Sequence, residues 1–114
     1  GSVAVEPSAV LQVRRLGALA LPQAYSLAQN FPNPFNPATT IRYELKEAGA
    51  VTLRIYDVMG QQVQELVNAP QSSGRHQVTW AGRDETGAQV ANGVYFYVLR
   101  AGEFRALRKM ILMK

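Results

Sequence analysis

Few side chains in this sequence have the types and spacing that chemistry requires. The chain contains one histidine and no cysteine, so imidazole chemistry would rest on His76 alone. A catalytic site needs at least two polar groups held against each other, such as a base and the group that orients it. His76 instead shares one face of a predicted strand with Val78 and Trp80, which favours a packing or surface role. We predict no catalytic residue and no enzymatic activity.

Asp84 and Glu85 are the only adjacent acidic residues, and they lie in a polar segment. Calcium requires six or more oxygen ligands from a preformed loop, so a calcium site here is the less favoured alternative. The favoured interpretation is that Asp84 caps a turn closed by Gly87. The sequence contains no glycine-rich phosphate loop, serine elbow or spaced set of metal ligands. We therefore predict no metal site and no cofactor.

Aromatic residues could instead form a binding platform for a glycan. The candidates are Tyr56, Trp80, Tyr95 and Tyr97. At strand spacing such rings are more often core residues, so a glycan- or cell-envelope-binding module of a secreted glycoside hydrolase is the alternative function. Single-stranded nucleic acid requires aromatic rings interleaved with Lys or Arg on one exposed face, and Arg54 beside Tyr56 is too little. We expect no nucleic-acid partner.

The net charge of +4 favours an acidic partner, and lipopolysaccharide is one candidate. The basic residues gather near the C-terminus: Arg100, Arg105, Arg108, Lys109 and Lys114. Lys and Arg on an edge strand also discourage unwanted pairing with other chains. We favour a solubilising edge over a polyanion site for this cluster.

The order of apolar and polar residues predicts strands. Residues 41–45 and 51–55 alternate, which indicates two neighbouring strands of a meander. Asp57 and Gly60 then have the chemistry of a tight turn. Further strands are predicted over residues 62–67, 75–80 and 94–100, with loops over residues 68–74 and 81–93.

Residues 94–100 are apolar on both faces, which predicts a central strand entered through Gly93. Residues 104–114 fit either a strand or a helical stripe, and a turn at Ala101-Gly102 favours a hairpin. The fold class is all-β: an antiparallel immunoglobulin- or fibronectin-like β-sandwich of about seven strands. We expect it to span residues 27–114, after a linker over residues 1–26 that begins with a tag scar at Gly1-Ser2. An edge strand over Val10–Val13 is the alternative for part of the linker.

The stretch NFPNPFNPATTIRY, residues 30–43, introduces the first strand. Each proline moves the preceding residue out of the helical region, so we predict a stiff, extended segment. Asparagine side chains can bond nearby backbone, and Phe31 and Phe35 can attach the segment to the sandwich.

The chain resembles the type A C-terminal sorting domain of type IX secretion substrates over residues 27–114. The resemblance is carried by NFPNPFNPATTIRYEL, VTLRIYDVMGQQVQEL and residues 74–114. That family is related to the immunoglobulin-like domain of flagellar hook-capping proteins. The resemblance places the family's recognition motifs on Asn33, Pro34, Phe35, Asn36, Pro37, Lys109, Met110, Leu112 and Lys114. It places structural motifs on Tyr56, Asp57, Gly60, Val63, Gly93 and Tyr95.

The resemblance implies a non-catalytic module that directs an upstream cargo domain across the outer membrane. The implied partners are an outer-membrane translocon and a sortase-like peptidase, and the implied location is secreted, at the cell surface or outer membrane. We further expect the C-terminal strand to lie at a sheet edge that a partner sheet could extend. Lys109 and Lys114 would then contact the partner while Met110 and Leu112 dock on the sandwich.

We expect the domain to fold without a metal ion, since the sequence offers neither thiolates nor a ligand cluster. Adding a chelator should leave the melting temperature unchanged in differential scanning calorimetry. A drop of several degrees would reveal an ion site, and Asp84→Asn with Glu85→Gln would locate it.

Overall fold

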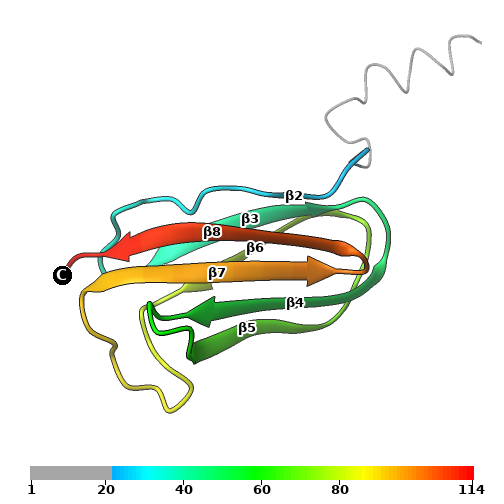
Figure 1. Cartoon of the computed structure of the whole chain (residues 1–114). Coiled ribbons are helices and arrows are strands. Elements are labelled where there is room, and N and C mark those ends of the chain that lie inside the picture. The colour runs from blue at the N-terminus through cyan, green and yellow to red at the C-terminus, as the bar shows by residue number, and fades with distance from the viewer. Residues whose placement is uncertain (1–21) are drawn as a thin grey trace, which may run out of the picture.

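The computed structural model describes residues 22–114, which form two antiparallel sheets packed face to face (Figure 1). The three-stranded sheet has the order β2 (Ser26–Leu27), β3 (Thr39–Leu45), β6 (Gly74–Trp80). The four-stranded sheet has the order β5 (Gln62–Gln71), β4 (Gly49–Tyr56), β7 (Gly93–Ala101), β8 (Phe104–Leu112). The predicted antiparallel immunoglobulin-like sandwich of about seven strands is confirmed.

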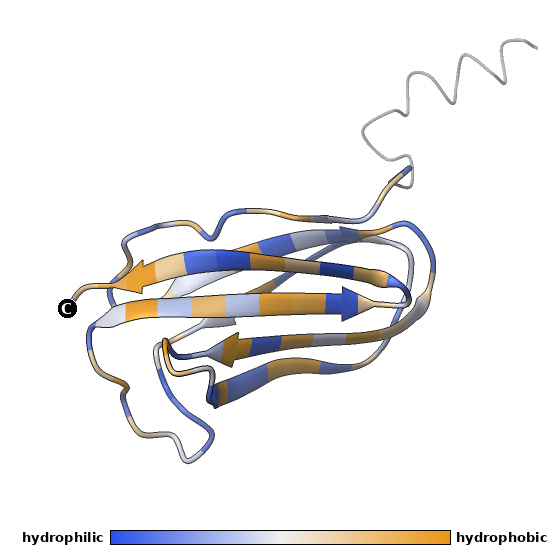
Figure 2. Ribbon diagram, in the orientation of Figure 1, coloured by the Kyte–Doolittle hydropathy of each residue, from blue (hydrophilic) through white to orange (hydrophobic). Residues whose placement is uncertain are grey.

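The core lies between the sheets because successive side chains of a strand point to opposite faces. Figure 2 shows the resulting alternation of apolar and polar bands along the strands. On β7, Tyr95, Tyr97 and Leu99 point into the core. β7 lies between β4 and β8, so its predicted central position is confirmed. Trp80 at the end of β6 is also buried.

The predicted meander of the first two long strands is wrong. β3 pairs with β2 and β6, whereas β4 pairs with β5 and β7, so the connection over residues 46–48 crosses from one sheet to the other. Both strands bury one face, and in a sandwich two such strands can face each other across the core instead of pairing. Alternation therefore identifies the buried face of a strand but not its neighbour.

Two strand boundaries also differ from the prediction. β5 continues through residues 68–71, which were expected to be loop, and Pro70 pairs with Ala50. Because β5 is an edge strand, its proline costs no ladder hydrogen bond on the open side. The final hairpin is confirmed, but its turn is Gly102-Glu103, since Ala101 pairs with Phe104.

The N-terminal predictions fall mostly outside the described residues. The tag scar, the alternative strand over Val10–Val13 and most of the predicted linker lie within residues 1–21. Tyr25, just before the predicted domain start, stacks on Phe104 with ring centroids 5.2 Å apart. From residue 22 onward the structure has no helix of the length and apolarity needed to cross a membrane.

Asp57 and Gly60 form the predicted tight turn after β4. One carboxylate oxygen of Asp57 accepts hydrogen bonds from the amides of Met59 and Gln61, both at 2.9 Å. The Gly60 amide donates to the Asp57 carbonyl at 3.0 Å, with a φ of 82° at Gly60. Gly93, at the start of β7, has a φ of 144°.

We expect Gly60→Val and Gly93→Val each to lower the free energy of unfolding by about 1–3 kcal/mol, because branched residues avoid positive φ. Gly49→Val is the matched control: Gly49 has no positive φ, and a Cβ at any of the three positions would meet no atom within 4 Å. Urea denaturation measures the differences. Equal midpoints for all three variants would contradict the assigned backbone role.

Candidate recognition site

The segment between β2 and β3, residues 28–38, is here called the arm. It runs beside β8, at the outer edge of the four-stranded sheet (Figure 1). The Phe35 amide donates to the Ile111 carbonyl, and the Met113 amide donates to the Phe35 carbonyl, both at 3.0 Å. This pair of bonds makes a short parallel bridge between Phe35 and Leu112.

Two side chains of the arm satisfy further backbone groups of β8. The Asn33 Oδ1 accepts from the Ile111 amide at 2.9 Å. The Gln29 Nε2 donates to the Lys109 carbonyl at 2.6 Å. The edge expected to be open to a partner sheet is therefore covered over residues 109–113. Its outward backbone groups at Arg105 and Leu107 have no such partner among the described residues.

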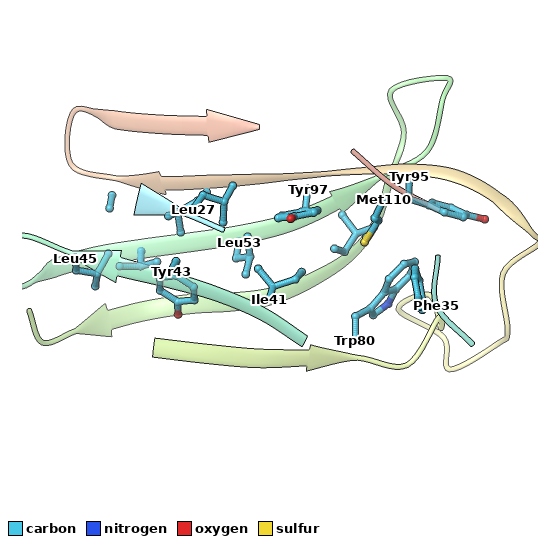
Figure 3. Close-up of a cluster of buried hydrophobic side chains, with 14 of the residues drawn as sticks. Leu27, Phe35, Ile41, Tyr43, Leu45, Leu53, Trp80, Tyr95, Tyr97 and Met110 are labelled. Atoms are coloured by element: carbon cyan, nitrogen blue, oxygen red, sulfur yellow. The ribbon is translucent and has the colours of Figure 1, made fainter. Parts of the chain in front are cut away.

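Phe35 fixes the arm to the core. Its side chain is 1% exposed and lies against the Trp80 ring, with centroids 5.7 Å apart. Trp80 in turn meets Tyr95 edge to face at 5.4 Å, and Met110 lies nearby (Figure 3). Tilted and edge-to-face ring pairs are favourable beyond their buried area. The arm and the end of β8 thus share one apolar cluster.

A buried polar network fixes the other end of the arm. The Tyr97 hydroxyl donates to the Ala28 carbonyl at 2.7 Å and accepts from the Asn30 amide at 2.8 Å. The Asn30 Nδ2 donates to the Thr39 Oγ1 at 3.0 Å and to the Pro32 carbonyl at 3.2 Å. Burial raises the pKa of the Tyr97 phenol, so at neutral pH it stays a hydroxyl that can donate and accept.

The structure brings together part of the predicted recognition set. Asn33 and Phe35 lie against the end of β8, where Met110 and Leu112 are buried as expected. Pro34, Asn36 and Pro37 lie on the surface of the arm, which bends at these residues. The segment predicted to be stiff and extended therefore contains bends, because the arm must turn to reach both β8 and β3.

One expectation for an individual side chain is wrong. The Phe31 side chain does not attach the arm, because it is 71% exposed; only the Phe31 backbone bonds β3, at Thr40. The Lys114 Nζ donates to the Val90 carbonyl at 2.7 Å, and its contact with a partner stays a prediction. Lys109 is exposed and keeps the position expected of a contact residue.

Three residues that hold the arm were not predicted from the sequence to do so: Gln29, Thr39 and Tyr97. A signal was available for Tyr97, because a tyrosine on a strand that is apolar on both faces needs a buried partner for its hydroxyl. The prediction that asparagine side chains bond nearby backbone applies to Asn30, whose Nδ2 donates to the Pro32 carbonyl. No local signal indicates its bonds with Thr39 and Tyr97.

The candidate reactive groups are all used structurally. His76 stacks on Tyr43 with centroids 5.4 Å apart. The Asp84 carboxylate accepts from the Thr86 hydroxyl at 2.6 Å and from the Ala88 amide at 3.0 Å, which lowers the pKa of Asp84. Gly87 closes this turn, as predicted, by donating to the Asp84 carbonyl. Across residues 22–114, no three His, Cys, Asp or Glu side chains gather in a metal-binding arrangement.

Residues 36–103 match the FlgD Ig-like domain family. The chain is 21% identical to latent PorU from Porphyromonas gingivalis, with a TM-score of 0.61 over 79% of this chain and 9% of that one. For PorZ from the same organism the identity is 19% and the TM-score 0.53, over 81% of this chain and 12% of that one. FlgD from Xanthomonas campestris is 22% identical to this chain, with a TM-score of 0.55 over 88% of this chain and 73% of that one.

These identities are low, so the likeness to solved structures shows the fold alone. The chain spans about a tenth of the PorU and PorZ chains, 9% and 12%. No curated protein matches it significantly.

We expect Tyr97→Phe to release the N-terminal end of the arm, because it removes the hydroxyl bonded to Ala28 and Asn30. The free energy of unfolding should fall by about 1–3 kcal/mol. Hydrogen exchange of the Asn30 amide should accelerate by more than this global change explains. Tyr95→Phe is the control, since that hydroxyl bonds the Ala91 carbonyl at 2.7 Å, away from the arm. If the Asn30 amide exchanges faster only by the amount that the global loss of stability explains, the assigned role of Tyr97 in holding the arm is contradicted.

Proposed function

The chain belongs to the FlgD Ig-like domain family, a non-catalytic domain type, and from this premise we propose that it is a C-terminal sorting module of type IX secretion. In this role the module directs an upstream cargo domain across the outer membrane to the cell surface. Its proposed partners are the outer-membrane translocon and a sortase-like peptidase. The module itself catalyses no reaction.

One observation carries this proposal. The two segments that the resemblance identifies as recognition motifs meet in space, although Asn33 and Ile111 are 78 residues apart in sequence. The exposed Asn33 and Met113 and the half-buried Ile111, held over the buried Phe35 side chain, form a single surface, here called the arm–β8 corner. A receptor that reads this corner would bind only a domain whose two ends have come together.

The structural neighbours support the secretion context. PorZ is described as an essential bacterial surface component of the type IX secretion system. A sandwich of similar fold in that protein is consistent with a module used at the same surface. The net charge of +4 also suits an anionic surface acceptor such as lipopolysaccharide.

The glycan-binding alternative has less support. Three of the four aromatic residues that could form a platform are buried: Trp80 at 2%, Tyr95 at 7% and Tyr97 at 0% exposure. They pack in the core and cannot stack on a sugar without unfolding. Of the four, only Tyr56 lies at the surface, and one partly buried ring is a poor glycan platform.

The proposal is tested by fusing a fluorescent reporter to the whole chain in a host that has the type IX system. We expect the reporter at the cell surface in the parent strain and retained in the periplasm when the translocon gene is deleted. Lys109→Glu should reduce surface delivery several-fold, because Lys109 is exposed beside the arm–β8 corner. Its effect on the melting temperature should be small, as for most exposed substitutions.

Lys46→Glu is the matched control, since Lys46 is exposed in the turn between β3 and β4. It makes the same charge change away from the arm–β8 corner. Equal surface delivery with and without the translocon would contradict the sorting function. An equal fall in surface delivery for Lys109→Glu and Lys46→Glu would instead assign the effect to the change in net charge.

A further inference from the structure

The outer face of the four-stranded sheet carries an unusual combination of apolar and basic side chains. Phe96 and Val98 of β7 and Leu107 of β8 lie on this face, on the opposite side of their strands from the core. With Tyr56 they line a shallow groove of about 390 Å³. Leu107 is 57% exposed, and Val58 and Met59 in the adjoining turn are 66% and 80% exposed. Phe96 is half-buried and Val98 is 7% exposed, so the exposed apolar surface on this side is mainly that of Leu107, Val58 and Met59.

Basic side chains flank this apolar centre. Arg100 and Arg105 line the groove and are cross-strand partners, so two positive charges lie directly opposite each other. Lys109, the partner of Phe96, stands toward the other end of β8. Like charges directly opposite each other on a sheet destabilise it. The folded domain thus keeps an unfavourable arrangement beside an apolar groove.

The acidic groups near the groove do not neutralise this pair. Glu65 is held by Arg54 at 2.7 Å, and the Asp57 carboxylate is bound by the amides of its own turn. Over the residues that the structure describes, neither Arg100 nor Arg105 makes an ion pair. Both guanidinium groups are exposed, and each can bind a carboxylate through two parallel hydrogen bonds.

We propose that this face, here called the Arg100–Arg105 face, binds a segment of a partner protein that carries carboxylates between apolar side chains. Charge complementarity identifies the occupant: carboxylates would pair with the two arginines while apolar side chains fill the groove beside Phe96, Val98 and Leu107. An apolar centre with a charged rim is the usual composition of a protein interface. The inference does not rest on the sorting function. Lys109 borders both this face and the arm–β8 corner, so Arg105 is the residue that distinguishes them.

Two other occupants fit less well. A second copy of this chain would bring four arginines together on this face. A lipid would need an apolar region open at one side for its chains, whereas cationic residues flank this groove toward both ends of β8. An acidic, apolar protein segment satisfies both the charges and the groove.

The test uses the purified full chain and a short synthetic peptide in which glutamate alternates with leucine. Two-dimensional NMR should show saturable shifts confined to the Arg100–Arg105 face. The affinity should fall at least tenfold between about 0.05 M and 0.5 M salt, since exposed ion pairs are screened. A peptide in which lysine replaces glutamate should not bind.

Arg105→Glu separates binding from folding. It converts the opposed arginines into an ion pair with Arg100, so the melting temperature should stay constant or rise while peptide affinity falls at least tenfold. Arg42→Glu, on the outer face of β3, makes the same charge change and should leave peptide binding unaffected.

Shifts that map elsewhere, or equal affinity for the lysine peptide, would overturn the proposal. Binding of the chain to phosphatidylglycerol vesicles through this face, without binding to the acidic peptide, would overturn the assignment of a protein partner. Concentration-dependent self-association lost in Arg105→Glu would assign the face to a second copy.

Discussion

The last strand lies at a sheet edge, and the outward backbone groups at its C-terminal end must find hydrogen-bond partners. The arm supplies them through the backbone of Phe35 and the side chains of Asn33 and Gln29. This requirement explains why the arm bends, since it must reach β8 before it enters β3. It also explains why Phe35 is buried against Trp80: a backbone bridge needs an apolar anchor to hold its register.

The hydrogen bonds between the arm and β8 also determine when the proposed recognition surface can form. The arm–β8 corner contains residues from both ends of the described chain, so it can form only after the C-terminal residues have joined the sandwich. A receptor that recognises this corner would distinguish a complete, folded domain from an incomplete one. The Arg100–Arg105 face lies on a different surface, formed by β4, β7 and β8 and the turn after β4. The sandwich thus has two surfaces of different chemistry. The arm–β8 corner is built from residues distant in sequence, and the Arg100–Arg105 face combines basic and apolar side chains.

Much of the fold could be predicted from local pattern. The alternation around Ile41 and Leu53 identified strands and their buried faces, and the apolar run after Gly93 identified the central strand. Strand neighbours could not be predicted, because β3 and β4 have similar patterns and differ only in which distant strand they pair with. The arm's attachment to β8 was also hidden, since backbone groups make its main contacts and leave no signature in residue type. Asn33 and Met110 were assigned as recognition residues by the family resemblance, and not by any local sequence pattern.

Amide hydrogen exchange of the full chain tests most directly whether the arm completes the edge of β8. The amides of Phe35, Ile111 and Met113 should exchange as slowly as those of the central strands, because their hydrogen bonds break only with the sandwich. The amides of Gln77 and Thr79 on the open edge of β6, which pairs with β3 alone, provide the fast reference. Exchange of Phe35, Ile111 and Met113 at the rate of that reference would contradict the account, since the arm would then not be part of the folded sandwich.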